Sequence, residues 1–106
     1  MLVKQDFQIE KDKFLLRLFR KAITALSRMD LSNLEINAEA NFKDEFGFSI
    51  VIFNSEKYNN RAFFYPFEPD DRLSNRLETV IDAIKKDDFE TVVKAIESDL
   101  DKRWTA

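Results

Sequence analysis

The chain has 106 residues, of which 44% are hydrophobic and 13% aromatic, and its net charge is −3. This length suits one domain, residues 1–106, and the aromatic content is typical of a packed interior. The sequence contains neither Cys nor His, which excludes disulfides and Cys-ligated zinc and removes the commonest general base and metal ligand. We therefore predict a single folded domain without a cofactor or a metal.

No stretch of the sequence predicts contact with a membrane. Its apolar runs are all far shorter than the roughly 20 residues that a membrane span requires. The first six residues lack the long apolar core of a signal peptide. The expected compartment is therefore the cytoplasm.

The first segment to be assigned is residues 1–10, where Phe7 and Ile9 alternate with polar neighbours. This pattern predicts either a fourth, edge strand of a sheet or a tail held by Phe7. From Asp12 to Met29, apolar side chains recur at three- and four-residue spacing, which predicts a helix.

Basic residues line the other side of this expected helix, at positions Lys13, Arg17, Arg20, Lys21 and Arg28. A solvated outer surface is the favoured interpretation, and a surface for nucleic acid or an acidic partner is the alternative. Residues 11–30 hold six basic and two acidic side chains, whereas residues 31–71 hold three basic and eight acidic ones. We expect a molecule with a positive and a negative side.

Three strands are predicted next, over residues 34–42, 46–53 and 61–67. The first alternates strictly between apolar and polar residues, so one of its faces should be buried and the other exposed. The second is apolar on both faces and belongs in the centre of the sheet. Pro66 places the third at an edge or ends it. Short connections make the sheet an antiparallel meander.

Two helices are predicted after the strands, one beginning near Asp70 and one near Asp87. An Asp at the N-cap accepts hydrogen bonds from the free backbone donors of the first turn, and Asp87 and Glu90 have the spacing of a capping box. Capping explains the adjacent acids better than a metal does, because neighbouring side chains diverge and ligands must converge.

The expected fold is therefore α+β: an antiparallel three-stranded meander sheet, four-stranded if residues 1–10 join it, with a long N-terminal helix and two C-terminal helices. This order resembles the restriction-type nuclease core, but residues 61–67 lack the acid-x-Lys motif of that family. It also resembles the double-stranded-RNA-binding domain, whose second helix starts with Lys residues where this chain has a mostly acidic segment, residues 68–72. Both resemblances are topological. Catalysis is not expected, and nucleic-acid binding in the manner of the double-stranded-RNA-binding domain is not expected either.

The strongest functional indication is the second face of the predicted sheet. Alternation places on it the polar residues of the first strand and aromatic residues of the later strands: Glu35, Asn37, Glu39, Asn41, Phe53, Phe63 and Tyr65. Tyr58, in the loop before the third strand, completes the set of candidate partner-binding residues. Aromatic side chains in such number are rarely left in water. Either the two C-terminal helices cover this face or another molecule does.

The leading hypothesis is a non-enzymatic binding protein, an immunity or inhibitor protein that blocks a basic surface of a toxin or defence enzyme. A second hypothesis is a dimeric chaperone or adaptor in which the aromatic strand pairs with its own copy. A third is a nucleic-acid-binding protein that uses the basic side of the N-terminal helix.

Overall fold

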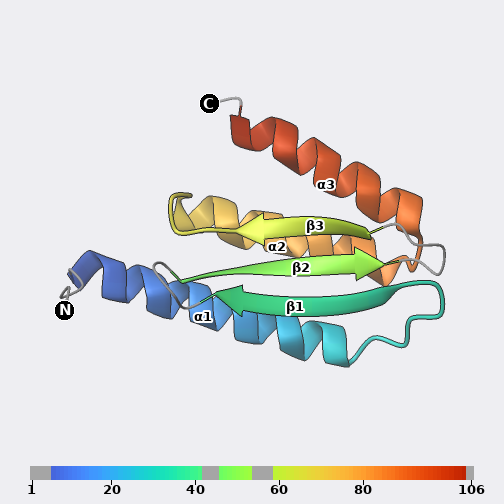
Figure 1. Ribbon diagram of the computed structural model, residues 1–106, viewed down its shortest axis with the longest axis horizontal. Coiled ribbons are helices and arrows are strands. Elements are labelled where there is room, and N and C mark those ends of the chain that lie inside the picture. The colour runs from blue at the N-terminus through green and yellow to red at the C-terminus, as the bar shows by residue number, and fades with distance from the viewer. Residues whose placement is uncertain (1–5, 42–45, 54–58, 105–106) are drawn as a thin grey trace.

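The computed structural model describes residues 6–41, 46–53 and 59–104 (Figure 1). Along the chain, one helix precedes the three strands and two helices follow them, which confirms the α+β class and the predicted order. The elements are α1 (Asp6–Ser27), β1 (Glu35–Asn41), β2 (Gly47–Phe53), β3 (Asn59–Phe64), α2 (Asp70–Lys85) and α3 (Phe89–Trp104).

The sheet has the order β1-β2-β3, and both pairings are antiparallel, as the sequence predicts. β2 is central and is buried on both faces over most of its length. β3 lies at an edge and ends at Phe64, two residues before Pro66. The predicted strand over residues 61–67 is thus displaced towards the N-terminus, since Pro66 has no N–H and also restricts the residue before it.

α1 begins at Asp6, so the prediction that Phe7 and Ile9 form a fourth strand is wrong for the part of the N-terminal segment that the structure describes. Two alternating apolar residues are too few to specify a strand. Lys11 fixes this end of α1 instead, by an ion pair to Asp70 and a hydrogen bond to the carbonyl oxygen of Glu68. Phe7 projects into solvent with 73% of its surface exposed.

One core joins all six elements, and it lies on a single face of the sheet. α1 and α2 run side by side behind the strands in Figure 1, and α3 packs against α2 and lies beside β3. The fully buried side chains of this core include Leu15 of α1, Phe48, Ile50 and Ile52 of β2, Phe64 of β3, Leu73, Leu77, Val80 and Ile84 of α2, and Val92 and Ile96 of α3.

This arrangement excludes one of the two predicted ways of covering the second sheet face, cover by the C-terminal helices. The apolar stripes of α2 and α3 join the same core as α1, so neither C-terminal helix is available for the opposite face. In Figure 1 no described helix crosses the front of the sheet. A three-layer domain is therefore not formed: α1 packs on β1 and β2, α3 packs on β3, and α2 contacts both of these helices.

The helix starts differ from the predicted caps. The N-cap of α2 is Pro69, which makes no side-chain capping bond, and Asp70 lies in the first turn. The cap of α3 is Asp88 and not Asp87: its carboxylate accepts hydrogen bonds from the backbone N–H and the hydroxyl of Thr91, at 3.1 and 2.6 Å. The prediction of an Asp87–Glu90 capping box is thus wrong: the cap lies one residue later, and the Asp87 carboxylate binds the backbone of Ser32 and Asn33 instead.

Asp87 has a different role. It follows the C-terminal end of α2 and adopts a left-handed backbone conformation, with a φ of 53°. Its carboxylate accepts hydrogen bonds from the backbone N–H groups of Ser32 and Asn33, at 2.8 and 2.9 Å. Asn33 in turn donates its side-chain amide to the carbonyl oxygen of Asp87, at 3.0 Å. The α1–β1 connection is therefore fastened to the α2–α3 turn.

Candidate functional site

The candidate site is the solvent-facing side of the sheet, called the outer face below. Cross-strand pairing places Glu35 opposite Phe53 and Ser49 opposite Phe63, and opposite residues in an antiparallel sheet point to the same side. Seven of the eight predicted site residues consequently share this face: Glu35, Asn37, Glu39, Asn41, Phe53, Phe63 and, just after β3, Tyr65. The eighth, Tyr58, lies outside the described residues.

β1 contributes a polar strip, defined by Glu35, Asn37, Glu39 and Asn41. All four side chains are exposed, and the residues between them are half-buried, which confirms the predicted alternation. This strip is less acidic than its sequence indicates, because Glu39 forms an ion pair with Arg61 of β3 at 3.1 Å. The outer face therefore presents two carboxylates and one guanidinium among its described residues.

Arg61 was not among the predicted site residues, although it has the same strand parity as Phe63 and Tyr65. It pairs with Val51 on β2, yet its guanidinium reaches β1 on the other side of that strand. The Arg61 methylenes must therefore pass over β2, where Val51 and Ser49 are only 1% and 6% exposed. The centre of the outer face is thus shielded from solvent by side chains, although no described helix lies above it.

An aromatic row runs along β3 and out into the turn that follows, and it consists of Phe63, Tyr65 and Phe67. Ring centroids are 5.5 Å apart between Phe63 and Tyr65 and 5.9 Å apart between Tyr65 and Phe67. The Arg61 guanidinium lies 5.8 Å from the centre of the Phe63 ring. Phe67 is 69% exposed, so the row ends in a ring that a partner can reach.

Gly47 of β2 makes room for this row. A Cβ atom at Gly47 would lie 2.7 Å from Cδ1 of Tyr65 and 3.3 Å from the backbone oxygen of Phe64. Because Gly47 lacks a side chain, the Tyr65 ring can lie close against the strand. A hollow of about 200 Å³ remains beside it, between Glu39, Ser49 and Arg61.

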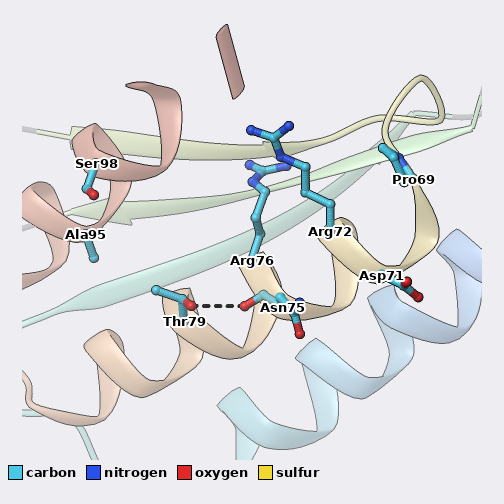
Figure 2. Close-up of a pocket in the computed structure, with 8 residues that line it drawn as sticks. All are labelled: Pro69, Asp71, Arg72, Asn75, Arg76, Thr79, Ala95 and Ser98. Atoms are coloured by element: carbon cyan, nitrogen blue, oxygen red, sulfur yellow. Dashed lines mark hydrogen bonds between the residues drawn. The ribbon is translucent and has the colours of Figure 1, made fainter. Parts of the chain in front are cut away.

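A second hollow, of about 430 Å³, lies between α2 and α3 and is shown in Figure 2. Arg72 and Arg76 extend from α2 in the same direction, while Asp71 points away from them. Arg76 is buried, forms an ion pair with buried Glu68 and donates to the Phe63 carbonyl oxygen at 2.7 Å. Its guanidinium also lies 4.8 Å from the centre of the Phe64 ring. Arg76 thus holds β3 to α2, a structural task.

The five basic residues of the predicted surface are all exposed: Lys13, Arg17, Arg20 and Lys21 of α1, and Arg28 just after it. Two of them have acidic partners, because Lys13 lies 3.4 Å from Glu10 and Lys21 lies 3.6 Å from Glu78. These pairs reduce the positive charge that α1 offers to a phosphate backbone.

Within the described ranges, no three acidic, His or Cys side chains come together as a metal site. Among the described residues, Asp88 has a clearly shifted pKa: the hydrogen bond from the Thr91 hydroxyl lowers it from its ordinary value of 3.8. Asp88 caps α3, so this shift belongs to helix capping. None of the described helices combines the length and the apolar character that crossing a membrane requires.

Comparison with known proteins adds no assignment to this geometry. No family model matches the chain, and neither a curated protein nor a solved structure matches it. Function is therefore inferred from the side chains of this chain alone.

Proposed function

We propose that the chain is a non-enzymatic protein-binding module that docks its partner on the outer face. In this proposal it acts in the cytoplasm as an immunity or inhibitor protein and blocks a basic surface of a toxin or defence enzyme. The observation that supports it best is the aromatic row beside the polar strip, on a sheet face that no described helix covers.

The two halves of the outer face suit different parts of such an interface. Exposed rings such as Phe67 supply large rigid anchors, the kind of side chain that dominates binding energy at protein interfaces. Glu35 supplies negative charge that steers a basic partner, and the Glu39–Arg61 pair adds polar groups that fix its orientation. The shielded centre over Val51 means that a partner meets a preformed surface, which limits the ordering cost of association.

A charge-reversal experiment tests the electrostatic half of the proposal. Partners are captured from the native extract with the parent chain, and the affinity of the captured partner is then measured by calorimetry. Glu35→Lys/Glu39→Lys should weaken binding at least roughly tenfold. The matched control is Glu78→Lys/Asp82→Lys, which also reverses the charge of two exposed carboxylates four residues apart, but on α2. Glu78 lies 3.6 Å from Lys21, and Asp82 lies 3.6 Å from Lys85. Failure to recover a partner, or equal affinity of both variants, contradicts the proposal.

A second comparison tests the aromatic half. Phe67 and Phe7 are both highly exposed, at 69% and 73%, so replacing either by Ala should leave the fold intact. Phe67→Ala should weaken binding of the partner roughly tenfold or more, whereas Phe7→Ala should not. If the partner is an enzyme, inhibition of its activity should change in the same order.

A further inference from the structure

The free side of β1 is an unprotected sheet edge. β1 pairs with β2 through a continuous one-to-one register from Glu35 to Asn41, so it contains no bulge, and it contains neither Pro nor Lys. Proteins usually prevent an edge strand from pairing with another chain by bulges, Pro or charged side chains, Lys above all, and the charged residues of β1 are Glu35 and Glu39. Its other long side meets no strand among the described residues. β1 is therefore competent to accept a further strand.

We infer that this strand is β1 of a second copy, paired antiparallel about a two-fold axis at Ala38, so that two sheets join into one of six strands. In this register Ala38 faces its own copy, Asn37 faces Glu39 of the second copy, and Glu35 faces Asn41 of the second copy. Each carboxylate thus meets an amide, a pairing without like-charge repulsion. A two-residue shift in either direction would place Glu35 opposite Glu39 or Glu39 opposite itself.

The inner side of the same edge is also incomplete in a single chain. A groove of about 430 Å³ lies between the C-terminal part of α1 and β1, lined by Ile23, Leu26, Met29 and Leu31 of α1 and its connection and by Ile36 and Ala38 of β1. Ile23 is 44% exposed, which is unusual for an Ile beside a core. Ile36 and Ala38 are only half-buried.

The two-fold axis that pairs the β1 strands also lies beside this groove, since Ala38 is at the axis and lines the groove. An axis perpendicular to the sheet at Ala38 places the second α1 antiparallel to the first and on the same side of the sheet. Because Ile23, Leu26 and Ala38 line one groove, this axis brings the grooves of the two copies to the same interface. Strand pairing and apolar contact thus occur around one axis, as an isologous interface requires.

A second copy fits better at β1 than at the other strands. β2 has a strand on each side, and α3 lies beside β3. The β1 interface leaves the aromatic row free and brings two polar strips together in the middle of a wider outer face. This inference depends on the β1 edge and the α1 groove, and it is independent of the partner proposed above.

The test is the mass of the full-length chain by sedimentation equilibrium over a range of concentrations. A dimer has twice the 12.5 kDa mass of the chain. Asn37→Glu, which places a carboxylate opposite Glu39 of the second copy, should raise the dimer dissociation constant roughly tenfold, and Asn37→Lys should lower it. Both changes are at an exposed position, so the fold should persist, as circular dichroism can verify.

The helix side of the interface has its own variant. Ile23→Lys places a charge at the centre of the apolar groove and should give a monomer, whereas Thr24→Lys, on the exposed neighbouring position of α1, should leave the dimer unchanged. A parent chain that sediments with the mass of one chain at all concentrations overturns the inference. So does a dimer that is insensitive to both Asn37→Glu and Ile23→Lys. Because Phe67 lies outside the interface, Phe67→Ala should retain the dimer even where it abolishes partner binding.

Discussion

At the scale of single residues, the outer face depends on the contact between Gly47 and Tyr65. A Gly within a strand normally lowers the stability of a protein by about 0.5–1 kcal/mol relative to Ala, because the Gly backbone loses more freedom on folding. Here the missing Cβ is what allows Tyr65 to lie against β2, since an added Cβ would sit 2.7 Å from the ring. The sequence shows one glycine in an apolar strand, but not which ring it accommodates.

Gly47→Ala should therefore lower the free energy of unfolding by about 1–3 kcal/mol, because the Tyr65 ring must move. In a Tyr65→Ala background the same change should be neutral or slightly stabilising. Urea denaturation of the four proteins of this double-mutant cycle measures the coupling. Equal effects of Gly47→Ala in both backgrounds would mean that the ring is not the obstacle.

A second residue-scale prediction concerns Asp88 and pH. The Thr91 hydroxyl lowers the pKa of Asp88 from 3.8, so its carboxylate stabilises the folded state above that pH and ceases to do so as pH falls through the lowered pKa. Asp88→Ala should lower the melting temperature at pH 7, and the difference from the parent should shrink below a pH of about 3.8. Thr91→Val, which keeps the backbone donor, should have a smaller effect. A difference that is the same at pH 7 and pH 2.5 would contradict the capping role.

At the scale of elements, Arg76 joins α2 to β3 and to the turn between them. It pairs with Glu68, donates to the Phe63 carbonyl oxygen and lies over the Phe64 ring. Buried Arg is rare, and hydrophobic periodicity gives no means of finding one. The sequence predicts α2 from its apolar stripe, whereas the attachment of its polar side to β3 is visible only in three dimensions.

Arg76→Met should lower the free energy of unfolding by about 3–5 kcal/mol, since it leaves the Glu68 carboxylate buried without its guanidinium. Glu68→Leu/Arg76→Met should lower the free energy of unfolding less than Arg76→Met alone, because the Glu68 carboxylate is then removed together with the Arg76 guanidinium. Denaturant unfolding monitored by circular dichroism gives both values. A double variant that is less stable than Arg76→Met would contradict the ion-pair explanation.

Element types and order follow from the sequence wherever a long periodic pattern exists, and fail where the pattern is short. β1 alternates over nine residues from Leu34 to Phe42 in the sequence, and its described part alternates in burial. Phe7 and Ile9 give only two apolar positions, and the helix prevails there because Lys11 anchors it to α2. Asp87 and Asp88 are adjacent acids whose tasks differ because one adopts a left-handed conformation that local sequence rules do not assign.

At the scale of the whole molecule, the placement of α2 and α3 could not be derived from amphipathic stripes. An apolar stripe predicts that a helix buries one side. It does not indicate which face of the sheet that side packs against. The outer face contains the seven described residues that alternation placed there, and alternation is a local property. Its charge was overestimated, since the pairing of Glu39 with Arg61 spans all three strands.

The overall charge leads to a prediction about nucleic acids. The chain has a net charge of −3, and three of the five basic residues on α1, Lys11, Lys13 and Lys21, have acidic partners. We therefore expect no saturable binding of duplex DNA or RNA in fluorescence anisotropy even at low salt. Binding that falls steeply with salt and is weakened by Arg17→Ala/Arg20→Ala would instead support a nucleic-acid function.

The meander order of the sheet has a consequence for how the chain folds. Each strand pairs with its neighbour in sequence, so both hairpins close over short loops. The ties between the N-terminal part and the last two helices join residues 59 apart at Lys11–Asp70 and 54 apart at Asn33–Asp87. Local contacts form early in folding, and distant ones must wait for the loops to close. We expect Asp87→Ala to accelerate unfolding in a chevron experiment while leaving the refolding rate nearly unchanged.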